Sequence, residues 1–147
     1  MRDRIIPVLA SAVPPVRSQV IPMLTKILQY DFPEKWPGYI DITLQLLNTN
    51  DANSVFAGLQ CLLAICRVYR FKESEKRTDF DRIVEIAFPQ LLNIGTRLLD
   101  EESVEAGEML RTIVKAYKHA AYVILRNLFS FLFTPYGFLF VSLFEVD

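Results

Sequence analysis

Residues 31–37, DFPEKWP, constrain the fold more than any other part of this chain. They hold the only tryptophan and two prolines, and helical patterning precedes and follows them. Because a proline lacks a backbone N–H and fixes φ, neither Pro33 nor Pro37 fits the interior of a regular helix. One helix must therefore end near Tyr30, and the next begins directly after Pro37. We predict a structural corner between two helices, formed by Asp31, Phe32, Pro33, Trp36 and Pro37.

Apolar residues recur at spacings of three and four along most of the chain, which is the pattern of amphipathic helices. Val16, Val20, Met23 and Leu24 illustrate it and are expected to face inward. No strand-like alternation occurs before residue 126. We therefore predict an all-α protein with helices at about 2–11, 15–30, 37–48, 52–70, 79–99 and 101–125.

Long helices joined by short polar connectors are typical of an α-solenoid. Units of about 40 residues favour HEAT-type or armadillo hairpins over tetratricopeptide repeats. The 147 residues leave room for two to three such hairpins, in an array that we expect to be incomplete at both ends. The predicted division is the end of a preceding HEAT repeat at 1–13, repeats at 14–50 and 51–100, the first helix of a further repeat at 101–125, and an aberrant apolar tail at 126–147.

Composition argues against several functional classes. The formal net charge of −1 gives no sign of a nucleic-acid footprint. One histidine and two cysteines are too few for a metal cluster, and the spacing of Cys61 and Cys66 matches no zinc or redox pair. The acidic residues near 100–108 are expected to complement a helix dipole. We predict no catalytic, cofactor-binding or metal-binding residue, and no direct contact with nucleic acid.

A set of short motifs occurs in order along residues 1–122. It comprises RDxI at 2–5, VRxQ at 16–19, DFPxxWP at 31–37, LxCL at 59–62, YxFK at 69–72 and FPQLL at 88–92. In these motifs the chain resembles the importin-β (karyopherin-β) nuclear transport receptors, which are arrays of HEAT repeats. The likeness is closest to the large importins that carry ribosomal proteins and histones.

The resemblance implies a non-enzymatic receptor fragment that moves proteins through the nuclear pore and is found in the cytoplasm, in the nucleus and at the nuclear envelope. The implied partners are Ran-GTP, nucleoporins and cargo proteins, with ribosomal proteins and histones as cargo classes. We expect the helices at 37–48 and 79–99 to line the concave surface of the array. The polar candidates for partner contacts on that surface are Asp41, Gln45, Asp79, Arg82 and Glu85.

Two alternative functions stay open. Residues 128–144 form an uncharged, aromatic-rich run, which would suit a small tail-anchored membrane protein. A membrane-spanning helix needs about 20 apolar residues, and Pro135 and Gly137 interrupt this run, so a membrane partner is not expected. The other alternative is a generic HEAT-repeat scaffold for protein–protein interactions.

Overall fold

The computed structural model of the chain describes residues 2–72 and 78–132, and all regular secondary structure in that part is helical. The helices lie close to the predicted positions. Within the described residues they are α1 (Arg2–Ser11), α2 (Pro14–Asp31), α3 (Tyr39–Leu47), α4 (Ala52–Arg70), α5 (Thr78–Leu98) and α6 (Val104–Leu132).

The helix ends follow from local chemistry. Asp51 caps α4, because its carboxylate accepts a hydrogen bond from the Ser54 N–H at 3.0 Å. Phe32 ends α2 in an extended conformation, directly before Pro33. The sequence predicts that the last helix ends near 125, whereas α6 reaches Leu132. No proline occurs between Val104 and Leu132 to break the helix. Residues 133–147 lie outside the described residues, so the tail-anchor hypothesis stays untested.

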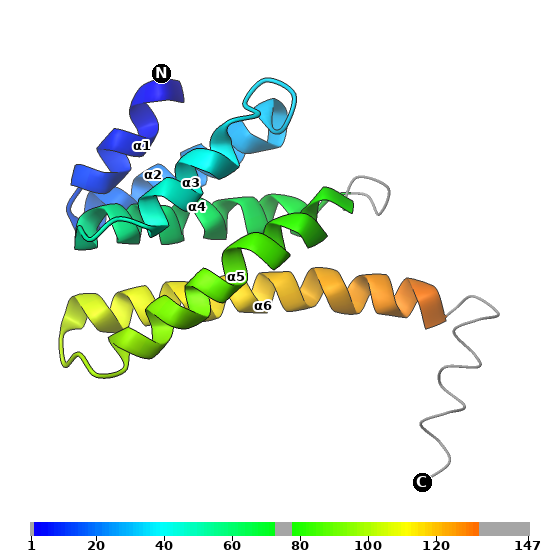
Figure 1. The fold of residues 1–147 in the computed structure, drawn as a ribbon. Helices are drawn as coiled ribbons and strands as arrows, with labels where there is room; N and C mark the ends of the chain where they lie inside the picture. The colour runs from blue at the N-terminus through cyan, green and yellow to red at the C-terminus, as the bar shows by residue number, and fades with distance from the viewer. Residues whose placement is uncertain (1, 73–77, 133–147) are drawn as a thin grey trace, which may run out of the picture.

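Figure 1 shows two layers of helices. α2, α4 and α6 run in one direction, and α1, α3 and α5 return in the opposite direction. α4 lies between α2 and α6 and contacts both extensively, while α3 packs on α4 and α5 packs on α6. This stack of antiparallel helical pairs confirms the predicted all-α solenoid architecture. The division into repeats by residue number stays a prediction.

α4 is the central helix of the stack. Every residue from 55 to 66 is buried, including both cysteines. Among the described helices, α4 is long and apolar enough to cross a membrane by length and composition, but 78% of the relevant stretch is buried inside the fold. Its apolarity is therefore explained by contact with α1, α2, α3 and α6.

The buried face of α2 differs from the predicted one. Val16 and Met23 were expected to face inward but are 46% and 49% exposed. Because α2 packs mainly on α4 and α1, only a narrow face is covered. Its buried residues recur at spacings of three and four: Arg17, Ile21, Leu24 and Leu28.

The predicted corner between α2 and α3 is a compact turn. The backbone N–H groups of Lys35 and Trp36 both donate to the Asp31 carbonyl, at 2.8 and 3.0 Å. Phe32 and Trp36 are buried, and their rings meet Tyr39 edge to face, with centroids 6.1 and 4.9 Å away. The Tyr39 hydroxyl in turn donates to the backbone carbonyl of the α4 residue Cys61 at 2.7 Å. The aromatic corner thus ties α2 and α3 to the central helix.

The two prolines of the corner are less enclosed than its rings. Pro33 is half-buried and Pro37 is exposed. The Arg2 guanidinium of α1 donates to the Lys35 carbonyl at 2.6 Å and lies 5.7 Å from the centre of the Trp36 ring. These contacts explain Trp36 as a packing residue of the corner.

Candidate protein-binding surface

The spacing of the helices indicates which layer is concave. In a curved two-layer stack, the inner helices lie closer together than the outer ones, and the concave side offers an extended binding surface. α4 contacts α2 and α6 extensively, whereas α3 and α5 touch only weakly. This spacing favours α2, α4 and α6 as the inner layer. The sequence predicts α3 and α5 on the concave side, whereas the spacing favours the reverse assignment.

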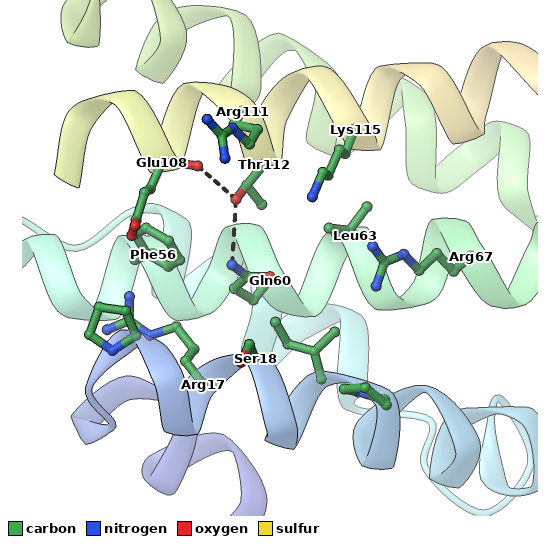
Figure 2. A pocket seen from close by; sticks show the side chains of 13 residues that line it. Arg17, Ser18, Phe56, Gln60, Leu63, Arg67, Glu108, Arg111, Thr112 and Lys115 are labelled. Atoms are coloured by element: carbon green, nitrogen blue, oxygen red, sulfur yellow. Dashed lines mark hydrogen bonds between the residues drawn. The ribbon is translucent and has the colours of Figure 1, made fainter. Parts of the chain in front are cut away.

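A groove of about 330 Å³ runs along α4 in the inner layer. α4 forms its floor through Phe56, Gln60, Leu63 and Arg67, and α2 and α6 form its two sides (Figure 2). We call this feature the inner groove. Its lining residues are Pro14, Arg17, Ser18, Ile21, Pro22, Phe56, Gln60, Leu63, Arg67, Glu108, Arg111, Thr112 and Lys115.

Arg17 is a buried cation at one end of the inner groove. Its side chain is only 8% exposed, and its guanidinium lies 4.1 Å from the centre of the Phe56 ring. One guanidinium nitrogen donates to the Ala12 carbonyl at 3.0 Å. Burial lowers the pKa of Arg17, and the nearby Glu108 carboxylate opposes that shift. Arginine side chains are not deprotonated in proteins, so Arg17 is a cation.

Gln60 and Thr112 form a polar pair on the floor of the inner groove, where α4 meets α6. The Gln60 Nε2 donates to Thr112 Oγ1 at 3.4 Å, and the Thr112 hydroxyl donates to the Glu108 carbonyl at 2.9 Å (Figure 2). Both side chains are buried. Within the described residues, the Gln60 Oε1 and the Arg17 Nε are buried without a hydrogen-bond partner. Such atoms are unusual in folded proteins and call for an explanation.

The other end of the inner groove is cationic. Figure 2 shows Lys115 of α6 and Arg67 of α4 directed into the same part of the groove. Burial lowers the pKa of the neighbouring His119, and the positive charges of Arg67, Arg70, Lys118 and Lys115 lower it further. The electrostatic potential is therefore positive along the facing parts of α4 and α6.

The five polar residues predicted from the sequence are all exposed, but they lie in the other layer. Asp41 and Gln45 are on α3, and Asp79, Arg82 and Glu85 are on α5. The structure therefore groups them on two neighbouring outer helices and places none of them in the inner groove. Their role as partner contacts stays a prediction.

The polar residues of the inner groove are not among the contact residues predicted from the sequence. Arg17 belongs to the VRxQ motif, and Gln60 stands in the otherwise apolar run 55–66 of α4. A glutamine or arginine at a buried helical position was the available signal, because such side chains are seldom fully buried without partners. Among the residues that the structure describes, no group of three or more His, Cys, Asp or Glu side chains could hold a metal ion.

The stacked antiparallel helices define the class of this chain as a HEAT-type α-solenoid segment. Comparison with known proteins supports the importin family within that class. The chain is 34% identical to "Importin beta-like SAD2 homolog" of Arabidopsis thaliana over 126 residues, which is 84% of this chain. It is 26% identical to Importin-8 of Homo sapiens over 117 residues, or 80% of this chain.

One relative with the same sequence identity as the Arabidopsis protein is not named as an importin. The chain is 34% identical over 130 residues, 83% of its length, to "Nonsense-mediated mRNA decay protein 5" of Saccharomyces cerevisiae. The matched region spans 12% of that protein, 12% of the Arabidopsis protein and 11% of the human one. No protein-family model and no solved structure matches the chain.

Proposed function

We propose that this chain is a segment of a nuclear import receptor that binds Ran-GTP and cargo and carries proteins through the nuclear pore. The observation that carries the proposal is the similarity to importins over about four fifths of the chain, together with the helical stack that such receptors require. The segment acts by binding and performs no catalysis.

The proposed mechanism uses the curvature of the solenoid. Ran-GTP and cargo favour different curvatures of the array, so that binding of one shifts the population away from the form that binds the other. Nucleoporin contacts let the receptor pass the nuclear pore, and the receptor therefore moves between cytoplasm and nucleus. We propose ribosomal proteins and histones as the cargo classes, following the large importins that the motifs resemble most.

Two surfaces are available for these contacts. The inner groove is the first, because the concave side of a solenoid presents the largest continuous surface to a partner. The exposed outer-layer residues are the second. The candidates there are Asp41, Gln45, Asp79, Arg82 and Glu85.

The test is nucleotide-dependent binding. The full chain is immobilised, and Ran loaded with a non-hydrolysable GTP analogue or with GDP is passed over it in an interferometry assay. We expect stronger binding of the GTP form, since a transport receptor must distinguish the two states. Equal binding of both forms would contradict the proposal and leave a generic helical-repeat scaffold as the better description.

Paired charge reversals locate the surface. One variant carries Arg82→Glu and Glu85→Arg on α5, and the other carries Arg111→Glu and Lys115→Glu on α6. All four residues are exposed, so both variants should fold. Loss of Ran-GTP binding in the α6 variant alone would assign the contact to the inner layer, and loss in the α5 variant alone would assign it to the outer layer.

A further inference from the structure

The shape of the inner groove suits an elongated ligand. Its volume of about 330 Å³ is near the lower limit for small-molecule sites, which enclose most of their ligand. The inner groove is instead open, with α4 beneath it and α2 and α6 on either side (Figure 2). An extended peptide can lie in such a groove and keep part of its backbone in water.

The charge of the inner groove is positive although the whole chain carries −1. Four of its lining residues are cationic and one is acidic. Arg111 and Lys115 are exposed on α6, and Arg67 is half-buried on α4. The single carboxylate, Glu108, lies near Arg17 at the opposite end. Cations that face one groove attract a ligand of opposite charge and set its orientation.

Two buried polar atoms without hydrogen-bond partners indicate which groups a ligand of the inner groove must carry. The Arg17 Nε is an unpaired donor, and the Gln60 Oε1 is an unpaired acceptor. Their residues are 8% and 7% exposed and line the inner groove. Neighbouring groups cover both atoms in the free chain, so a ligand reaches them only when the two side chains turn toward the groove, and it must then offer an acceptor and a donor. A peptide supplies both, because its backbone carries one C=O and one N–H per residue.

We propose that the inner groove binds an acidic peptide segment of a protein partner. Carboxylates of the segment pair with Arg67, Arg111 and Lys115. A backbone carbonyl oxygen of the segment accepts from the Arg17 Nε, and a backbone N–H donates to the Gln60 Oε1. The inference deepens the proposed receptor function, on which it rests, by naming the partner chemistry of its inner surface.

The same atoms disfavour the phosphodiester backbone of a nucleic acid in this position. A phosphodiester oxygen accepts hydrogen bonds but does not donate them, so it cannot satisfy the Gln60 Oε1. The Glu108 carboxylate would also repel a phosphate that approached Arg17. An acidic peptide avoids this repulsion by placing an uncharged backbone carbonyl near Glu108 and its carboxylates toward Arg111 and Lys115.

Fluorescence anisotropy tests the proposal. The probe is a fluorescein-labelled peptide of about 12 residues with alternating Glu and Ser, titrated with the full chain at about 50 mM NaCl. We expect saturable binding that weakens about tenfold when Gln replaces Glu in the peptide, and that weakens again at about 300 mM NaCl. A single-stranded oligothymidine of the same length serves as the competing probe.

Three variants report on the residues. The double variant Arg111→Glu with Lys115→Glu should weaken peptide binding about tenfold or more. The matched control Arg4→Glu reverses an exposed charge on α1 and should leave peptide binding unchanged. Gln60→Met keeps the length of the side chain but removes both the acceptor and the Nε2 donor to Thr112, and should weaken binding about threefold. Circular dichroism checks the helix content of each variant. If the double variant loses helix content, Lys115→Gln replaces it.

The possible results of the peptide and Ran assays distinguish the groove proposal from the receptor proposal. Peptide binding that survives the double charge reversal, or that is weaker than oligonucleotide binding, overturns the inference. A preference for Ran-GTP without peptide binding also overturns it, but leaves the receptor proposal standing. Peptide binding without any preference for Ran-GTP supports the groove assignment and contradicts only the transport function.

Discussion

Replacing Gly58 by alanine should destabilise the protein, although alanine is the better helix former. Gly58 lies within α4, where α3 approaches closely. A Cβ atom at this position would lie 3.0 Å from the Leu47 Cδ2 and 3.1 Å from the Leu46 Cβ. The Leu47 side chain can rotate, but the Leu46 Cβ is fixed to the backbone of α3. The backbone of α3 near Leu46 would therefore have to move away from α4 by a few tenths of an ångström.

Two opposing effects determine the magnitude. Removing a glycine from a helix interior stabilises by about 0.5–1 kcal/mol. Overpacking a close-packed contact costs about 1–3 kcal/mol. We therefore expect a net loss of about 1–2 kcal/mol in the free energy of unfolding, which for a chain of this size lowers Tm by roughly 3–7 °C.

The control is Gly95→Ala within α5. There the nearest atom to an added Cβ is the Ile113 Cδ1 at 3.7 Å, an ordinary contact distance. This variant should be more stable than the wild type by about 0.5–1 kcal/mol. Urea unfolding followed by circular dichroism measures both. A Gly58→Ala variant as stable as Gly95→Ala would refute the argument from the close approach of α3 and α4.

Three further outcomes follow from buried groups. Tyr39→Phe should cost about 1 kcal/mol in urea unfolding, because the hydrogen bond to the Cys61 carbonyl is lost. Burial raises the pKa of Cys61 and Cys66 to about 12, so a thiol reagent at pH 8 should label them only after unfolding. Burial and neighbouring cations lower the pKa of His119. The unfolded chain therefore binds that proton more readily, and stability should fall as the pH drops through about 6.5. His119→Gln should flatten this dependence between about pH 7.5 and 5.5.

Helices could be located from the sequence because their start and stop signals are local. The predicted range 52–70 agrees with α4, where Asp51 supplies the cap. The DFPEKWP segment likewise predicts the end of α2 and the start of α3 to within two residues. Proline geometry and side-chain capping act over a few positions, so they can be read without knowledge of the tertiary fold.

Local sequence signals could not predict which of the two helical layers is the inner, concave one. Which layer is inner depends on how closely neighbouring helices approach, and no single helix contains that information. Asp41 and Arg82 are polar residues on amphipathic helices, and either layer would expose them. Arg17 and Gln60 illustrate the same limit, because their burial arises only when α2 and α6 pack on either side of α4.

Binding in the inner groove should be coupled to the curvature of the stack. α2 and α6 both pack on α4 and make at most weak direct contact with each other. A peptide that bridges Arg17 of α2 and Lys115 of α6 would therefore favour the curvature that brings the two helices together. Cysteines introduced at the exposed positions Gln19 and Val114 can be spin-labelled selectively, because Cys61 and Cys66 are buried. Saturating acidic peptide should shorten the distance between the labels in pulsed electron paramagnetic resonance. An unchanged distance distribution at saturation would mean that the groove binds its ligand without any effect on curvature.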